Sequence, residues 1–166
     1  MATNFLEYSG GTNGFLTAPF NLMTTELNAL ANFVAGTSGT ALSSVGGTSG
    51  VFTQTNWGSG IWGVIDFVSG GAFTPTAGGY LAGWFLFSPD GGTTFEKNVA
   101  TQDMPRSPDF IIPLFASAYA ANDVSQSSGI VRIPWWSNKV FFSNHSGVAL
   151  PATGNIIKGA SVAIQY

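Results

Sequence analysis

The sequence contains no cysteine, and only 8% of its 166 residues are charged. Without cysteine, neither a disulfide nor a thiolate metal site can form. The charged fraction is about a third of that in a typical soluble domain. Only five Lys and Arg residues are present, too few for the basic stripe that phosphate binding requires. We therefore expect no nucleic-acid partner.

Long hydrophobic runs are also missing. No stretch approaches the ~20 apolar residues of a membrane span, and the first residues show no basic region followed by an apolar run, so we expect neither membrane insertion nor a signal peptide. Aromatic residues, by contrast, make up 14% of the chain, which is enough to build a core. Low charge suits a protein docked in an assembly, although a secreted lectin-like domain has a similar composition.

The first 22 residues predict an irregular arm, and residues 23–166 predict a single domain. The arm has many glycines and no sustained hydrophobic period. Its large apolar side chains must therefore pack on the domain or on a neighbouring molecule. They are Phe5, Leu6, Tyr8, Phe15, Leu16 and Phe20.

A short helix is predicted over residues 23–35. Large apolar residues recur there at the spacing of one helical face, at Met23, Leu27, Leu30 and Val34. Gly36 would end the helix. A strand is the alternative, because β-sandwiches often begin with a pair of strands.

The rest of the chain predicts strands separated by turns. In the last one, the alternation places Ile156, Ala160 and Val162 on one apolar face, which is expected to point inward. Two strands, 61–68 and 80–87, are apolar on both faces, so the arm, long loops or another subunit must cover their outer faces. This pattern predicts an all-β protein, a jelly-roll β-sandwich with an irregular N-terminal arm and at most one short helix. The predicted strands are 51–55, 61–68, 80–87, 110–115, 129–133, 140–144 and 156–166.

No catalytic, metal-binding or cofactor-binding residue is predicted. Residues 88–92 read as a turn, because a calcium loop would need more oxygen ligands than Asp90 and Glu96 supply. His145 is the only histidine, and its sequence neighbours indicate neither a catalytic triad nor a metal site. Asp66 is the only acid expected to be buried, as a hydrogen-bonded core or interface group. We therefore expect a protein that is not an enzyme.

Trp135 and Trp136 follow a proline and precede a turn. An exposed tryptophan pair can stack on sugar rings, anchor a protein interface or cap the end of the barrel. The sequence favours none of these three roles over the others.

Four segments resemble a family of small structural proteins in tailed-phage virions. They are TAGGYLAGWFLFSPDGGTTFE at 76–96, PRSPDFIIPL at 105–114, NHSGVALP at 144–151 and VAIQY at 162–166. The resemblance implies a jelly-roll cement, or decoration, protein on the outer surface of the icosahedral capsid. It would be assembled in the host cytoplasm, bind the phage major capsid protein and need no cofactor.

From this resemblance we expect a cement protein that self-associates as a dimer or trimer. The first alternative is a tail or baseplate accessory protein with a glycan-binding β-sandwich, and the second is a glycosidase, which would use a pair of carboxylates. The residues expected at a capsid or subunit interface are large and aromatic or aliphatic. They are Phe5, Leu6, Tyr8, Phe15, Phe20, Trp62, Trp84, Trp135 and Trp136.

Overall fold

The computed structural model describes residues 20–33, 46–51, 62–98, 103–134 and 137–162. Within these residues the chain forms eight strands and no helix, and hence none that is long and apolar enough to cross a membrane. The strands are β1 (Phe20–Met23), β2 (Gly46–Thr48), β3 (Trp62–Val68), β4 (Tyr80–Phe87), β5 (Phe110–Pro113), β6 (Val131–Arg132), β7 (Asn138–His145) and β8 (Ile156–Val162).

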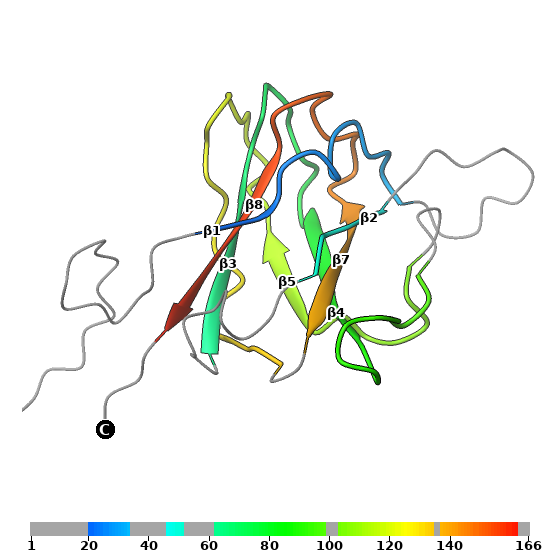
Figure 1. The fold of residues 1–166 in the computed structure, drawn as a ribbon. Coiled ribbons are helices and arrows are strands. Elements are labelled where there is room, and N and C mark those ends of the chain that lie inside the picture. Colours follow the sequence, from blue (N-terminus) through cyan, green and yellow to red (C-terminus); the bar gives the residue numbers. More distant parts are fainter. Residues whose placement is uncertain (1–19, 34–45, 52–61, 99–102, 135–136, 163–166) are drawn as a thin grey trace, which may run out of the picture.

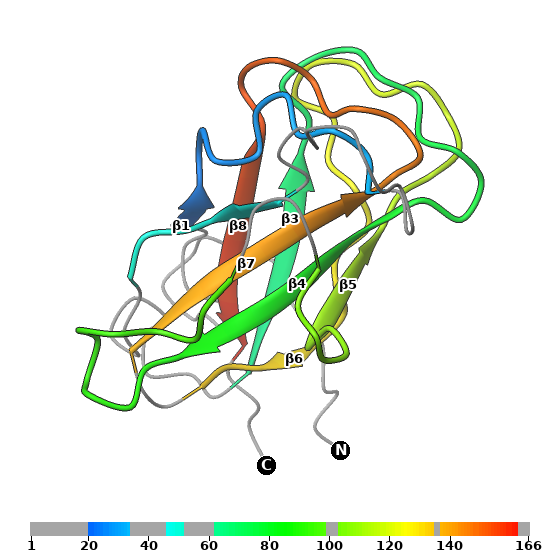
Figure 2. The same ribbon diagram turned by 90° about the vertical axis from the view of Figure 1, so that its right-hand side faces the viewer.

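The strands form two antiparallel sheets that pack face to face (Figure 1). Sheet A has the order β1-β8-β3-β6, and sheet B has the order β2-β7-β4-β5. Figure 2 shows sheet B in front of sheet A, with the long strands of the two sheets crossing at an angle. Eight strands in two sheets, with the first strand beside the last, make a jelly roll. The predicted fold class is confirmed.

The main core lies between the two sheets. Ile65 and Phe67 of β3 contribute to it from sheet A, and Leu81, Phe85 and Phe142 contribute from sheet B. The side chains of β3 and β4 alternate, so every second residue of each strand enters this core. These residues have low exposure, between 0 and 8%.

The outer face of sheet B is covered by the chain itself. Trp84 and Leu86 of β4 pack there with Phe141 of β7, and Met104 and Phe95 from the loop between β4 and β5 lie against them. The prediction that β4 is covered on both faces is confirmed. The arm, a long loop or another subunit was expected to cover this face, and a long loop does so.

The outer face of sheet A is also apolar, which corrects the expected orientation of β8. Ile157 packs in the main core, whereas Ala160 and Val162 lie directly opposite Val64 and Trp62 on the other face. The core side of this half of β8 carries the small residues Gly159 and Ser161, which lie opposite Ile65 and Gly63. Ala160 and Val162 are nevertheless buried, and Val64 and Trp62 are half-buried.

The predicted helix over 23–35 is wrong for the part that the structure describes. Met23 belongs to β1, and Leu27 and Leu30 are buried in a run of turns. The carbonyls of Leu27 and Leu30 accept hydrogen bonds from Asn155 and Asn144, respectively, instead of from a following helical turn. Long-range bonds thus replace the helical ones, and Val34 lies outside the described residues.

The strand limits differ from the predicted ones mainly at the N-terminal side. Phe20, assigned to the arm, begins β1 and pairs with Gly159 of β8. Val51 is described but is not in a strand, and the rest of the predicted 51–55 strand lies outside the described residues. Strand β4 has the predicted limits, and β7 extends beyond its predicted limits at both ends.

Candidate docking pocket at one end of the sandwich

Three of the nine expected interface residues fall within the described residues. Phe20 is partly buried against the main core, and Trp62 is half-buried on the outer face of sheet A. Trp84 is only 1% exposed, because the β4–β5 loop covers it and its Nε1 donates to the carbonyl of Arg106 at 3.0 Å. It is therefore a buried residue and not an interface candidate. Phe5, Leu6, Tyr8, Phe15, Trp135 and Trp136 lie outside the described residues.

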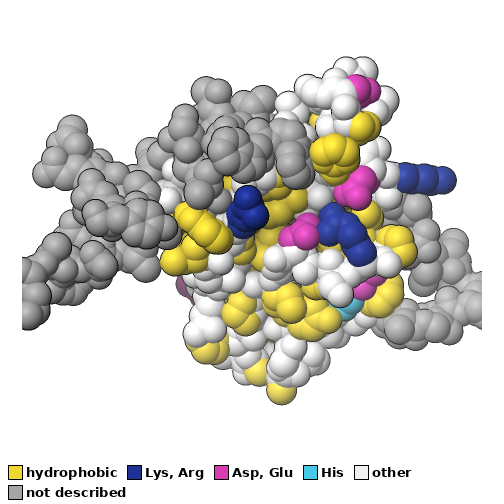
Figure 3. Space-filling view, turned by 90° about the horizontal axis from the view of Figure 1, so that it is seen from below, with side chains coloured by type: hydrophobic (Ala, Val, Ile, Leu, Met, Phe, Trp, Pro, Cys, Tyr) yellow, Lys and Arg dark blue, Asp and Glu magenta, His cyan; other side chains and the backbone are white. Residues whose placement is uncertain are grey.

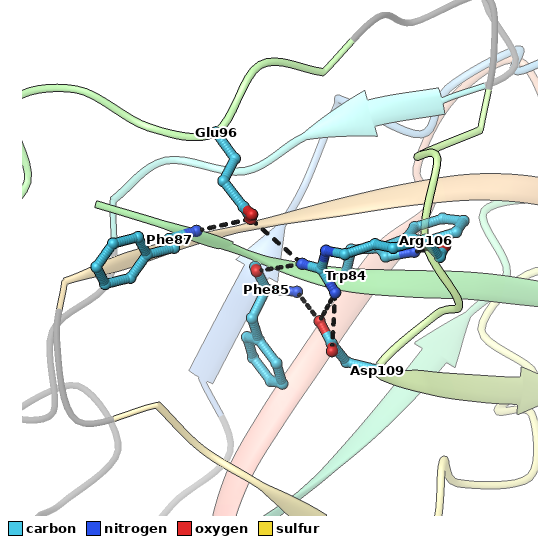
Figure 4. Close-up of polar contacts among 6 residues, drawn as sticks. All are labelled: Trp84, Phe85, Phe87, Glu96, Arg106 and Asp109. Atoms are coloured by element: carbon cyan, nitrogen blue, oxygen red, sulfur yellow. Dashed lines mark hydrogen bonds and ion pairs between the residues drawn. The ribbon is translucent and has the colours of Figure 1, made fainter. Parts of the chain in front are cut away.

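A cluster of charged side chains caps the free edge of β4 (Figure 4). Strand β5 pairs with β4 only as far as Gly83, so the backbone of the last residues of β4 needs other partners. Asp109 Oδ2 accepts from the Phe85 N–H at 2.7 Å, and Glu96 Oε2 accepts from the Phe87 N–H at 3.1 Å. Side chains thus close an edge that would otherwise be open to another strand.

Arg106 joins the two acids of this cluster. Its Nη1 lies 2.9 Å from both carboxylate oxygens of Asp109, and its Nη2 donates to the Phe85 carbonyl at 2.8 Å and approaches Glu96 Oε2 at 3.3 Å. Burial alone would lower the pKa of Arg106, but the bonds to Asp109 and Glu96 raise it. The guanidinium is therefore held firmly, and its charge is compensated.

A pocket of about 460 Å³ lies beside this cluster. Figure 3 views the end of the sandwich at which β3 begins and β4 ends, and shows acidic and basic side chains next to hydrophobic ones. The volume is within the range of ordinary ligand pockets. The pocket is lined by Phe85, Phe87, Glu96, Arg106, Asp109, Arg132, Ile133 and Pro134.

The two sides of the pocket differ in their chemistry. The cluster of Glu96, Arg106 and Asp109 lies on one side. The other side comes from β6 and the two residues after it, where Arg132 is exposed. Within the part of the chain that the structure describes, Arg132 forms no ion pair. The pocket therefore combines apolar walls with an exposed arginine on one side and a cluster of net charge −1 on the other.

The segment 88–92 forms a turn, as predicted. Asp90 accepts hydrogen bonds from the backbone N–H groups of Thr93 and Thr94 and from the hydroxyls of Thr94 and Ser88. These bonds, led by that from the Thr94 N–H, lower the pKa of Asp90 to about 2. The oxygens of Asp90 thus hold the turn, and Glu96 bonds Phe87 instead. No group of three or more metal-ligating side chains occurs among the described residues.

The structure brings partners to His145 that the sequence did not indicate. Its Nε2 lies 2.9 Å from Ser143 Oγ and 3.1 Å from Asp103, and its ring stacks on Tyr80 with centroids 4.8 Å apart. Serine and aspartate share one ring nitrogen here, whereas a catalytic triad places them on opposite nitrogens. The Ser143 hydroxyl also donates to Asp103. This arrangement ties the β4–β5 loop to β7.

Asp66 is half-buried, on the outer face of sheet A opposite Lys158. Burial raises the pKa of Asp66, and the positive charge of Lys158 partly offsets this effect. Of the two predicted settings for Asp66, the core is wrong, because its neighbours Ile65 and Phe67 are the ones that point into the core, and the interface stays a prediction. The charge pair interrupts an otherwise apolar face.

Sequence reasoning missed the Arg106 cluster as a unit. The only local signal is the spacing of three residues between Arg106 and Asp109, and Glu96 joins them through the fold. No protein-family model, no curated protein and no solved structure matches the chain.

Proposed function

We propose that this chain is a structural virion protein of a tailed bacteriophage. It binds the outside of the icosahedral head as a dimer or trimer and cements neighbouring major capsid proteins. The resemblance of residues 76–166 to phage cement proteins suggests this role, and the jelly-roll fold suits it. The mechanism is additive contact area, which reinforces the joints between capsid subunits against the pressure of packaged DNA.

The observation that carries the proposal is a contrast between the charged and the hydrophobic side chains at the surface. The charged side chains of Arg106, Asp103 and Asp90 form ion pairs or hydrogen bonds that stabilise the fold. Large hydrophobic side chains, by contrast, remain 41 to 57% exposed, and each can supply apolar contact area to a binding partner. Within the described residues they are Val51, Phe87, Ile111, Phe115, Val124 and Ile130.

The size of the molecule is sufficient for this role. The accessible surface is 8868 Å², and one side of a specific interface needs about 800 Å². A subunit can therefore contact two or more capsid proteins. Phe115 and Val124 flank a second, smaller pocket of about 200 Å³, which adds another apolar contact point. The low charge reduces the desolvation cost of such contacts.

Copy number in purified virions tests the proposal. We expect a stained gel to show hundreds of copies per particle, with the band retained on heads separated from tails. A handful of copies that stay with tails would contradict the head location and support the tail or baseplate alternative. Absence of the protein from virions would reject both.

A further inference from the structure

The pocket beside the Arg106 cluster has features of a binding site for a protein segment. Its volume of about 460 Å³ is sufficient for the side chains of a short peptide segment. Phe87 is 41% exposed at its rim, and Ile133 and Pro134 form part of its opposite side. An apolar side chain can therefore enter and contact both walls.

The charged residues of the pocket determine which charge the partner can carry next to that apolar side chain. Asp109 and Glu96 more than compensate Arg106, so the cluster has a net charge of −1 and does not attract an anion. Arg132 is exposed and has no acidic partner among the described residues. A carboxylate gains most at Arg132, because a planar guanidinium matches a carboxylate with two parallel hydrogen bonds.

We propose that this pocket binds a segment of the major capsid protein in which a large apolar side chain lies next to an Asp or Glu. The apolar side chain fills the space between Phe87 and Pro134, and the carboxylate pairs with Arg132. This inference rests on the proposed function and names the chemistry of the capsid partner.

The Arg106 cluster gives the pocket its shape before binding. It occupies the backbone N–H groups of Phe85 and Phe87, so a partner meets side chains and cannot add a strand at this edge. The cluster also holds one wall in place through four hydrogen bonds of Arg106. A wall ordered in advance reduces the entropy lost on binding.

Binding to purified heads that lack this protein tests the proposal, with Arg132→Gln as the main variant and Lys97→Gln as its control. Lys97 is exposed, does not line the pocket and loses the same charge. We expect Arg132→Gln to bind up to about 5-fold more weakly at low salt, the upper end for one exposed charge pair. The difference should shrink in 1 M salt, where charges are screened, and Arg132→Lys should recover part of the affinity.

The apolar half of the proposal has its own variant. Phe87→Ser should weaken binding roughly 10-fold at low and high salt alike, because it removes apolar contact area. Urea melts of each variant check that the fold is retained.

The outcomes separate this inference from the proposed function. If the unmodified protein does not bind heads, both are rejected. If it binds and Arg132→Gln behaves like Lys97→Gln, the docking site is wrong and the cement function stands. If Arg132→Gln weakens self-association in sedimentation but leaves head binding unchanged, a second copy occupies the pocket and the capsid segment is the wrong partner.

Discussion

Replacing Asn155 with alanine should destabilise the protein strongly, although Asn155 does not line the proposed docking pocket. Its side chain is completely buried. The amide nitrogen donates to the carbonyls of Leu27 and Pro151, and Oδ1 accepts from the Gly70 N–H at 3.1 Å. One side chain therefore joins the turn after β1, the loop before β8 and the end of β3.

The magnitude follows from the groups that would lose their partners. The Pro151 carbonyl keeps a bond from the Ala29 N–H. The Leu27 carbonyl and the Gly70 N–H have no other hydrogen bond among the described residues. Each buried group left without a partner costs about 1–3 kcal/mol. The expected loss in the free energy of unfolding is therefore about 2–6 kcal/mol, or roughly 4–24 °C in melting temperature.

Equilibrium unfolding in urea measures this loss as a lower midpoint at an unchanged m value. The control is Asn98→Ala. Asn98 is partly exposed, and among the described residues its amide bonds only the Thr48 hydroxyl at 2.6 Å, so water can replace that bond. We expect the control to lose about 1 kcal/mol or less. A loss for Asn155→Ala no larger than that of the control would refute the reasoning.

Three further predictions follow from the same structure. Deleting residues 2–19, which leaves Phe20 and β1 intact, should give a folded domain that binds heads poorly, because we expect the apolar side chains of the arm to pack on a neighbouring molecule. Binding as tight as that of the full chain would show that the arm does not contribute to head binding. Burial raises the pKa of Asp66, so the folded state keeps a proton that the unfolded chain has lost. The contribution of Asp66 to stability should therefore fall as the pH rises above the ordinary value of 3.8, and Asp66→Asn should remove this contribution from urea melts at several pH values. Asp90→Ala and added chelator should both leave head binding near normal, because the oxygens of Asp90 hold a turn. If a chelator detached the protein from heads, this segment would have to be interpreted as a metal site.

The strands that the sequence predicted best are those with the strongest local signal. In β4 the residues of both faces are large and apolar, so neither the strand nor the need for a cover depended on knowing its neighbours. The predicted helix failed for the opposite reason. The spacing of Met23, Leu27 and Leu30 is helical, but Asn144 and Asn155, far along the chain, provide the hydrogen bonds that decide the local structure.

The candidate site was only partly predictable for a related reason. Alternation along β8 separates its two faces but does not reveal which of them meets the core, because the pairing with β3 decides this. The cluster of Arg106, Glu96 and Asp109 exists because β5 stops pairing at Gly83 and leaves part of β4 uncovered. Such an edge is a property of the assembled sheet and has no counterpart in residue spacing.

The bonds between Asn28 and Asn155, which lie 127 residues apart, also set an order for folding during synthesis. At 5–20 residues per second, the ribosome needs about 6–25 s to deliver the second partner after the first. During that interval β1 has not yet gained its partner strand β8. The apolar faces of β3 and β4 stay exposed, and the chain carries little charge that would make two copies repel each other. Synthesis from many messages at once therefore favours association of incomplete chains.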